Sequence, residues 1–325
     1  MHHQYPKLPP LLEVGATIAV VAPAGIVNRP KLEASMAYLQ QLGFRTKTYR
    51  DIYADVHIFA GDDSARAAEL MSAFEDEEVQ AIFAARGGYG CIRLLNLLDF
   101  SLIANHPKIF LGYSDNTVLH AALTQKCNLV AYHGPHASDF RSPNGGMSVL
   151  SEAALWQTLL KGGVESLVGR LSNEIVKAAE EPNGLCKSLR SVVPGAARGP
   201  VVGGNLALVC ALLGTDFQIE TADKLLFLED VDEPPYRIDR FLQQLRLAGA
   251  LDQVSGVILG GFTRCEDPTS NWTTSSVLLE FFGDATFPVM TDFPAGHGDV
   301  NLTLALGLDT FVDPVAKRLV VTRDE

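Results

Sequence analysis

Cysteine and long apolar runs are both scarce in this 325-residue sequence. The five cysteines are scattered and none belongs to a CxxC pair, so neither a disulfide framework nor a zinc knuckle is expected. The most apolar early segment, Ala16–Ala22, is much shorter than the ~20 residues that cross a bilayer. The first residues also lack the charged and apolar regions of a signal peptide. We therefore expect a protein of the reducing cytoplasm without a membrane partner.

Positive charge is scarce as well. Lys and Arg number 26 against 38 Asp and Glu, which gives a formal net charge of −12, and no run of five Lys or Arg occurs. Nucleic acid and anionic membrane surfaces are therefore not expected as partners. Apolar residues make up 47% of the chain, which excludes a mainly disordered protein. The length predicts two domains.

The first half of the sequence alternates strand-like and helix-like segments. Short apolar runs such as Thr17–Val21 and Val79–Ala84 are separated by stretches with helical spacing of apolar residues. We expect strands at 17–21, 45–49, 79–84, 108–112 and 129–132, and helices around 32–39, 67–74, 91–98 and 115–123. Such repeated strand–helix–strand units predict an α/β domain with a doubly wound parallel sheet.

The composition changes between about Gly162 and Pro200. Gly, Pro, Ser and Asn are frequent there and the periodicity is weak, so we interpret the stretch as an interdomain connection with a hairpin or loop. Beyond it the pattern is mixed α/β, with strands expected at 225–228, 257–259, 302–308 and 318–322. Asn205 and Pro235 each stand at the start of an expected helix. The predicted domains are residues 1–165 and 200–325, joined by a linker at 166–199.

Two motifs that commonly bind ligands are absent or incomplete. The phosphate-binding pattern GxxxxGK[ST] does not occur, and Gly87-Gly88-Tyr89-Gly90 is followed by Arg93 where a dinucleotide loop has glycine. That glycine turn follows an expected strand and precedes a helix, so its N–H groups are placed to face an anion or an oxyanion; a turn without ligand is the alternative. Gly134 and Pro135 separate His133 from His136 and break any helix between them, so no metal site is expected.

A serine stands where the strand at 108–112 turns into the following helix. The run Gly112-Tyr113-Ser114-Asp115 would project the Ser114 hydroxyl above the carboxyl end of a parallel sheet, where doubly wound folds keep their sites. Ser114 or Asp115 could instead serve only as a helix cap. The nucleophile pattern GxSxG is not matched, because residue 116 is asparagine.

Two later segments carry the other groups of a catalytic triad. Glu229 belongs to several acids at the end of an apolar strand, and His297 stands between two glycines in a loop. A hydroxyl, an imidazole base and a carboxylate that orients the base form a workable triad in the order Ser114, Glu229, His297. A solvated acid and a surface histidine are the simpler alternatives.

Taken together, five ordered motifs closely resemble those of the LD-carboxypeptidase family of serine peptidases, which also contains the microcin C7 self-immunity peptidases. They extend over most of the chain, from about Ala16 to Val320. The motifs are Arg86-Gly87-Gly88-Tyr89-Gly90, Gly112-Tyr113-Ser114-Asp115, Gly203-Gly204-Asn205-Leu206, Leu228-Glu229-Asp230 with 235–240, and Gly296-His297.

The resemblance implies a fold and a set of site residues. The fold is a flavodoxin-like N-terminal domain followed by a smaller C-terminal α/β domain, in a homodimer that needs no metal or other cofactor. Ser114 matches the nucleophile, His297 the general base and Glu229 the acid that orients it. The oxyanion hole falls at Gly87 or Gly88 together with the N–H of Asp115. Residues placed by their position to bind substrate are Arg86, Tyr113 and Asn205, and of these Arg86 and Asn205 are the candidates for pairing with its free carboxylate.

The implied function is release of the terminal D-Ala from murein tetrapeptide during peptidoglycan recycling in the cytoplasm. An alternative within the family is an amidase that cleaves aminoacyl-nucleotide analogues, as the microcin immunity peptidases do. Some of those stack an adenine on tryptophan; here Trp156 is expected in the core, whereas Trp272 lies in a polar loop. A noncatalytic peptide-binding module is the alternative of another class. The sequence does not determine whether diaminopimelate or lysine is preferred as the third residue of the substrate.

Overall fold

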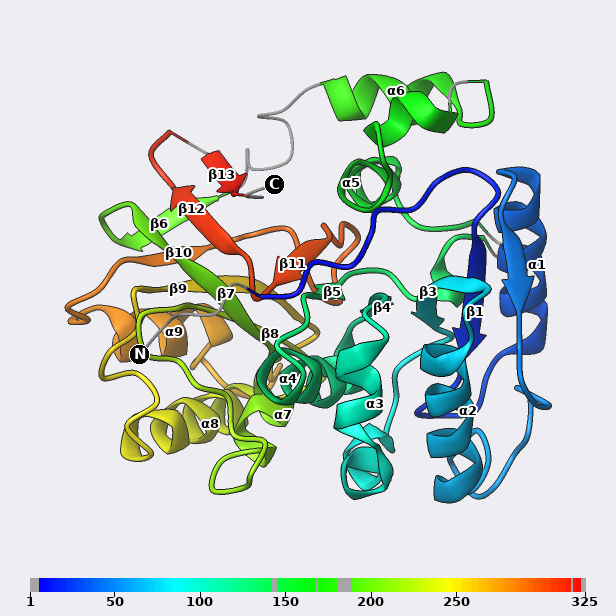
Figure 1. Ribbon diagram of the computed structural model, residues 1–325. Helices are drawn as coiled ribbons and strands as arrows, with labels where there is room; N and C mark the ends of the chain where they lie inside the picture. The colour runs from blue at the N-terminus through cyan, green and yellow to red at the C-terminus, as the bar shows by residue number, and fades with distance from the viewer. Residues whose placement is uncertain (1–5, 142–144, 168, 181–188, 317, 323–325) are drawn as a thin grey trace. The chain divides into compact units, whose positions relative to one another are not determined.

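The computed structural model describes residues 6–141, 145–167, 169–180, 189–316 and 318–322. The chain divides into two compact units (Figure 1). Unit 1 comprises Met1–Glu181 and Leu302–Ala305, and unit 2 comprises Pro182–Asn301 and Leu306–Glu325. Both units are α/β.

Unit 1 is built on a six-stranded sheet in the order β11-β5-β4-β3-β1-β2. The pairs from β5 to β2 are parallel. The order 2-1-3-4-5 of its first five strands is that of flavodoxin, so the predicted doubly wound fold is confirmed. The strands are β1 (Thr17–Val21), β2 (Arg45–Lys47), β3 (Val79–Ala84), β4 (Ile109–Gly112), β5 (Ala131–His133) and β11 (Leu304–Leu306).

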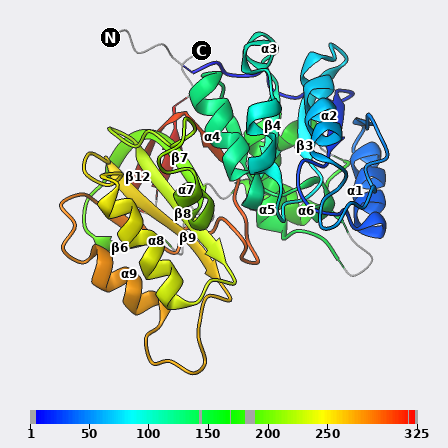
Figure 2. The ribbon, with the colours of Figure 1, turned by 90° about the horizontal axis from the view of Figure 1, so that it is seen from below.

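Helices cover both faces of this sheet. Right-handed crossovers place α1 on one face and α2, α3 and α4 on the other, as Figures 1 and 2 show. The α-helices are α1 (Arg29–Gln41), α2 (Asp63–Glu75), α3 (Phe100–Asn105), α4 (Thr117–Lys126), α5 (Val149–Leu159) and α6 (Asn173–Glu180). The 3-10 helices are η1 (Cys91–Leu97), η2 (Ser114–Asn116), η3 (Ala137–Asp139) and η4 (Gly163–Leu167).

The central strands explain why the apolar runs are continuous. All five residues of β1 are buried, because a strand inside a doubly wound sheet is covered on both faces. Trp156 is fully buried between Phe44 and Phe140, and its indole N–H donates to Glu152 Oε1 at 3.3 Å. The prediction that Trp156 lies in the core is confirmed.

Unit 2 contains a seven-stranded mixed sheet in the order β13-β12-β7-β8-β9-β10-β6. The run β7 to β10 is parallel, whereas β6, β12 and β13 are antiparallel to their neighbours, which confirms the predicted mixed α/β fold. The strands are β6 (Arg190–Val193), β7 (Ala197–Asn205), β8 (Leu225–Val231), β9 (Gly256–Thr263), β10 (Val289–Thr291), β12 (Asp309–Asp313) and β13 (Arg318–Val321).

Three helices connect the parallel strands of unit 2. They are α7 (Leu206–Ala211), α8 (Pro235–Leu247) and α9 (Thr274–Phe282). Since the strands follow one another in one direction, right-handed crossovers put all three helices on the same face, as Figure 2 shows. Asn205 caps α7 and Pro235 lies in the first turn of α8, as the sequence predicts.

Some predicted elements differ from the structure. The segment at 91–98, expected as an α-helix, forms the 3-10 helix η1. The stretch between Gly162 and Pro200 is predicted to be a connection with a hairpin or loop, but it also contains the helices η4 and α6, besides β6 and the first part of β7; residues 181–188 are outside the described residues. Within the described part of the chain, none of the helices has the length and apolar character that a membrane span requires.

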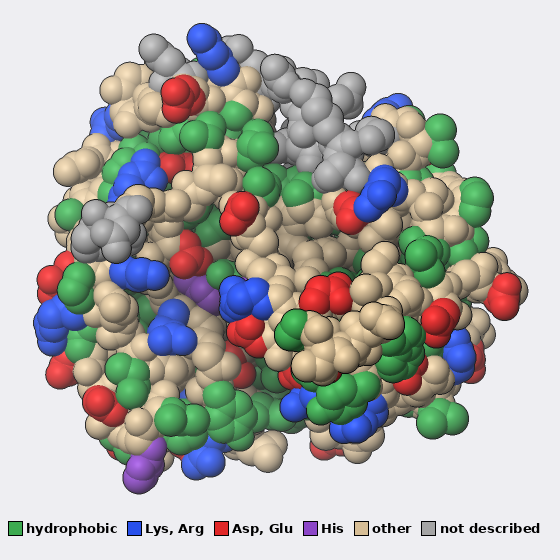
Figure 3. All heavy atoms as spheres, turned by 180° about the vertical axis from the view of Figure 1, so that it is seen from behind, with side chains coloured by type: hydrophobic (Ala, Val, Ile, Leu, Met, Phe, Trp, Pro, Cys, Tyr) green, Lys and Arg blue, Asp and Glu red, His purple; other side chains and the backbone are tan. Residues whose placement is uncertain are grey.

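Parallel strands bring the loops that carry the predicted site residues to one edge of each sheet. In unit 1, Gly87 follows β3, Ser114 follows β4 and His136 follows β5. In unit 2, Glu229 lies near the carboxyl end of β8, and the loop that carries His297 follows β10. On the face shown in Figure 3, Lys and Arg side chains are interspersed with Asp and Glu.

Candidate active site

Ser114 occupies a strained turn between β4 and α4, which we call the serine turn (Tyr113–Asn116). Its φ of +59° lies in the left-handed region, which costs a residue with a Cβ roughly 1–2 kcal/mol. No side-chain cap hydrogen bond is made at the start of η2 or of α4, so Ser114 is not a helix cap. Strain of this kind is typical of functional turns that surrounding contacts hold in place.

Asp115 fastens the serine turn to η1. Its buried side chain accepts a hydrogen bond from the backbone N–H of Cys91 at 2.8 Å. Burial raises the pKa of this carboxyl group, although the Cys91 N–H opposes the shift. The Asp115 side chain therefore has a structural partner, whereas the sequence singled out its backbone N–H.

Gly87 lies directly against Ser114. A Cβ added at residue 87 would stand 2.8 Å from Ser114 Cβ and 3.0 Å from Ser114 Oγ, so only glycine allows this approach. Gly88 has a φ of +110° and faces Gly25 and Arg86 instead. Of the two glycines left open by the sequence, Gly87 is the one next to the serine side chain.

Arg86 and Tyr113 are both held by neighbours within unit 1. The Arg86 guanidinium donates to the carbonyl oxygens of Ile26 at 2.9 Å and of Gly87 at 3.1 Å, so it joins the loops that follow β1 and β3. The Tyr113 ring stacks on His136 with 4.1 Å between ring centroids.

Unit 2 brings Glu229 and His297 together. His297 Nδ1 lies 2.7 Å from Glu229 Oε2; the carboxylate is fully buried, and the imidazole side chain is 15% exposed. Burial by itself lowers the pKa of His297, but the hydrogen bond to Glu229 and the negative charges of Glu229 and Asp230 outweigh it and raise the pKa above its ordinary value. The pair has the geometry of a base and the acid that orients it.

A glycine makes room for this pair. Gly296 has a φ of +109°, and a Cβ there would stand 2.5 Å from Glu229 Oε2 and 2.9 Å from Glu229 Cβ. The N–H of Gly296 donates to Asn301 Oδ1 at 3.0 Å, which fixes the loop. The glycine before His297 is thus required by the close approach of Glu229.

Asn205 and Asp230 form a second buried pair beside Glu229. Asn205 is the register partner of Glu229 across β7 and β8, and its amide donates to Asp230 Oδ1 at 2.8 Å. The other oxygen of Asp230 accepts the N–H of Ala207 at 3.0 Å. Burial raises the pKa of Asp230 to about 6. The Asn205 amide thus has a structural partner in this pair.

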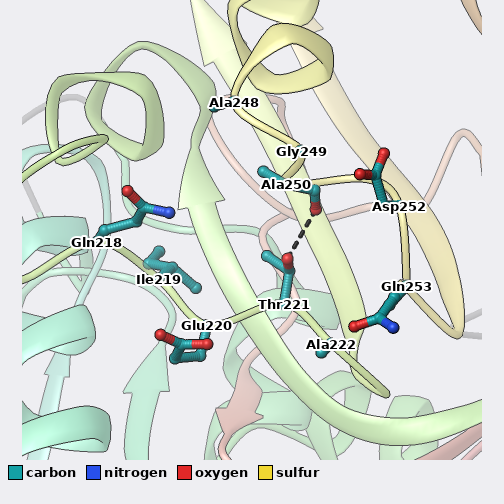
Figure 4. Close-up of a pocket in the computed structure, with 10 residues that line it drawn as sticks. All are labelled: Gln218, Ile219, Glu220, Thr221, Ala222, Ala248, Gly249, Ala250, Asp252 and Gln253. Carbon is teal, nitrogen blue, oxygen red and sulfur yellow. Dashed lines mark hydrogen bonds between the residues drawn. The ribbon is translucent and has the colours of Figure 1, made fainter.

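The structure also places the predicted histidine pair and one pocket of unit 2. His133 and His136 lie in or just after β5, and no group of three His, Cys, Asp or Glu side chains suited to a metal ion occurs among the described residues. A pocket of about 320 Å³ in unit 2 is lined by segments 218–222 and 248–253, which precede β8 and β9 (Figure 4). It therefore lies at the amino ends of those strands, whereas ligands of parallel sheets bind at the carboxyl ends.

Sequence reasoning passed over His136 except as a metal ligand. Its imidazole is bonded to the serine turn, and the signal that could have located it is its position just after β5, at the same sheet edge as Ser114. Asp230 stood in a motif but received no role. The contact of His136 with Asn116 and that of Asp230 with Asn205 each join residues 20 or more positions apart, which local spacing does not reveal.

Comparisons with known proteins agree with the motifs. The LD-carboxypeptidase N-terminal domain matches residues 18–134 and the LD-carboxypeptidase C-terminal domain matches residues 198–312. A probable murein peptide carboxypeptidase of Bacillus subtilis is 35% identical over 96% of this chain and 93% of its own. The microcin C7 self-immunity protein of Escherichia coli is 27% identical over 99% of this chain and 97% of its own.

A solved structure supports the same conclusion. The crystal structure of muramoyltetrapeptide carboxypeptidase from Oxalobacter formigenes superimposes with a TM-score of 0.75 at 27% identity, covering 93% of this chain and 97% of that one. The structural match and the two domain matches therefore point to the same family. The chain belongs to the LD-carboxypeptidase family of peptidases, as its motifs predict.

Proposed function

We propose that the protein is a serine-type LD-carboxypeptidase that releases the terminal D-Ala of murein tetrapeptide. Family membership and the name of the Bacillus subtilis relative support the substrate class. The observation that carries the chemistry is the 2.7 Å contact between His297 Nδ1 and a fully buried Glu229 carboxylate. A histidine paired in this way is equipped to act as a general base.

The first step is attack by Ser114. With Nδ1 of His297 donating to Glu229, the neutral ring carries its proton there and Nε2 is left as the acceptor. Ser114 Oγ attacks the carbonyl carbon of the bond that joins the third residue to D-Ala, and its proton moves to His297 Nε2. The negative charge of Glu229 stabilises the imidazolium that results.

The oxyanion of the tetrahedral intermediate needs donors. We assign them to the N–H of Asp115 and an N–H of the Gly87-Gly88 turn, because Gly87 lies against the Ser114 side chain. Loss of one such donor typically lowers kcat by about 10²–10³. The residues proposed to bind substrate are Arg86, Tyr113 and Asn205. Of these, Arg86 carries the positive charge that suits the free carboxylate of D-Ala.

Collapse of the intermediate completes the first half of the reaction. The C–N bond breaks, His297 transfers its proton to the leaving amine, and D-Ala departs. Water then attacks the acyl-enzyme ester while His297 takes its proton; the bond between the acyl carbon and Ser114 Oγ breaks, His297 returns the proton to Oγ, and the shortened peptide leaves with a new carboxylate. This mechanism uses no metal ion or organic cofactor. The proposed setting is peptidoglycan recycling in the cytoplasm, by a homodimer.

A serine-directed probe tests the nucleophile. After incubation with a fluorophosphonate, intact mass and peptide mapping should place one adduct on Ser114, and Ser114→Ala should lose both the adduct and D-Ala release. Ser101→Ala, which removes an exposed serine of α3, is the matched control and should behave as wild type. An adduct that persists in Ser114→Ala would refute the assignment.

A substrate comparison separates the two enzymatic alternatives. The 27% identity with the microcin C7 self-immunity protein favours an amidase acting on aminoacyl-nucleotide analogues as the second candidate. Trp272 lies partly exposed before α9, and its indole donates to Glu280 at 3.2 Å. Murein tetrapeptide and an aminoacyl-sulfamoyl adenosine are each incubated with the enzyme and analysed by mass spectrometry. We expect release of D-Ala from the tetrapeptide. Cleavage of only the nucleotide analogue would favour the amidase; tetrapeptide binding without cleavage or adduct would indicate a noncatalytic module.

A further inference from the structure

His136 is a buried imidazole for which the proposed mechanism has no use. It is 4% exposed, and its ring stacks on Tyr113 at the start of the serine turn. The Cβ that Gly87 lacks would lie 3.3 Å from His136 Cε1 and 2.8 Å from Ser114 Cβ. His136 and Ser114 therefore border the same side of Gly87.

Several contacts of the serine turn meet at one carbonyl group, that of Tyr113. Its oxygen accepts from the backbone N–H of Asn116 at 3.2 Å and from Asn116 Nδ2 at 3.0 Å, and His136 Nε2 lies 3.0 Å from it. This carbonyl belongs to the peptide bond that leads into Ser114. Its orientation therefore sets the φ of the serine.

The ring nitrogen contacts the turn in either protonation state. A protonated Nε2 donates to the Tyr113 carbonyl oxygen, and an unprotonated one accepts from Asn116 Nδ2 at 3.1 Å. At the other end of the ring, Asp139 Oδ2 accepts the backbone N–H of His136 at 2.8 Å and lies 3.5 Å from Nδ1. Nε2 therefore faces the serine turn, and Asp139 lies beside Nδ1 and holds the backbone of His136.

We propose that His136, oriented by Asp139, is a positioning residue that holds Ser114 in its left-handed conformation. The inference rests on the proposed role of Ser114 as nucleophile. Without the ring nitrogen, the Tyr113–Ser114 peptide can rotate toward the ordinary right-handed region, which moves Oγ away from its place beside Gly87. A displacement of about 1 Å is enough to lower a rate by about 10²-fold.

Two substitutions at His136 distinguish positioning from packing. His136→Phe keeps a ring to stack on Tyr113 but has no nitrogen. His136→Gln places an amide nitrogen the same number of bonds from Cα as Nε2. We expect His136→Phe to lower kcat for D-Ala release and the rate of fluorophosphonate acylation by about 30- to 100-fold, with KM changed less than about threefold. His136→Gln should stay within about fivefold of wild type.

His106→Phe is the matched control. His106 also lies in unit 1 and also places a ring nitrogen on a backbone carbonyl, that of Leu102 at 2.9 Å, but it stands at the end of α3. Loss of that bond should leave the acylation rate unchanged. If His136→Phe does not fold, Asp139→Asn provides the test, because it keeps an acceptor for the His136 N–H but removes the charge that orients the ring; it should lower the acylation rate several-fold.

The outcomes separate this inference from the proposed function. A wild-type protein without an adduct on Ser114 would overturn the nucleophile itself. A labelled wild type with His136→Phe folded and acylated at the same rate would overturn the positioning role alone. Equal losses in His136→Phe and His136→Gln, or a loss seen only in KM, would also contradict it.

Discussion

Single residues without side chains determine how closely the candidate catalytic groups approach their neighbours. Gly87 lets a backbone lie against Ser114, and Gly296 lets one lie against Glu229. In each place a methyl group would overlap atoms at 2.5–2.9 Å. Both glycines stood in motifs of the sequence, but their reason is a contact with a residue 27 or 67 positions away, which no local pattern contains.

Gly296→Ala should damage both stability and turnover. The new Cβ would overlap Glu229, and alanine would have to adopt a φ of +109°. The loop must therefore move away from the acid. We expect a loss of about 1–3 kcal/mol in the free energy of unfolding and a fall in kcat of about 10². Urea unfolding and D-Ala release measure the two effects.

Gly298→Ala is the control in the same loop. A Cβ there meets nothing nearer than 3.8 Å, so stability and kcat should stay close to wild type. Equal losses from the two substitutions would mean that the loop as a whole, and not the contact with Glu229, limits the enzyme.

The Glu229–His297 contact predicts a pH profile. The base must be neutral, so the rate of Ser114 acylation should rise with pH through the pKa of His297, which the hydrogen bond and charge of Glu229 hold above its ordinary value. In Glu229→Gln this support is lost, so the acid limb of the profile should move to lower pH while the plateau falls by at least about 10².

Glu233→Gln provides the comparison, since Glu233 follows β8 in the same acidic segment and pairs with Arg237 at 2.6 Å. Its acid limb should coincide with that of wild type. An acid limb that stays in place in Glu229→Gln would show that another group titrates in the wild-type profile.

At the scale of elements, patterns bounded by sharp turns were predictable. Residues 17–21 and 79–84 are predicted with the bounds of β1 and β3, because mainly apolar runs end near loop residues. The 3-10 geometry of η1 was not, since its apolar spacing matches either kind of helix. Helix α6 was missed because glycine- and proline-rich neighbours obscure a helix of two turns; its Ile175 is nevertheless buried.

The start of helix α7 is linked to strand β8. Asn205 Oδ1 accepts the N–H of Leu208 at 3.2 Å while its Nδ2 donates to the buried Asp230. Asn205→Ala should therefore lower the free energy of unfolding by about 2–3 kcal/mol, because it removes a cap and one of the two donors to a buried carboxylate oxygen, the other being the N–H of Val231 at 2.8 Å. Urea denaturation at pH 7 measures the change.

Asn28→Ala isolates the capping part of that loss. Asn28 caps α1 through a 3.1 Å bond to the N–H of Lys31 and is exposed, so its removal should cost only about 1 kcal/mol. The difference between the two variants measures the Asp230 contact. Equal losses would show that this contact adds nothing to stability.

At the scale of the whole molecule, each unit buries a titratable group, and burial shifts the two pKa values in opposite directions. His120 of α4 in unit 1 is 1% exposed, neither of its ring nitrogens has a hydrogen-bond partner among the described residues, and burial lowers its pKa to about 3. Asp230 in unit 2 has its pKa raised by burial to about 6. Both groups are uncharged in the fold over part of the acidic range.

The two units should therefore respond to acid in opposite ways through these groups. Below pH 6.5 the unfolded chain binds a proton that folded His120 refuses, so wild type should lose about 2–3 kcal/mol relative to His120→Leu as the pH falls from 7 to 4.5. Folded Asp230 instead keeps a proton that the unfolded chain releases above about pH 4. Wild type should therefore lose about 2–3 kcal/mol relative to Asp230→Asn as the pH rises from 4 to 6.

Hydrogen exchange measured by mass spectrometry tests both predictions, with each variant compared with wild type at the same pH. Peptides from α4 report on unit 1 and peptides from β8 report on unit 2. Differences that do not change with pH would show that the two groups titrate alike in the folded and unfolded chain.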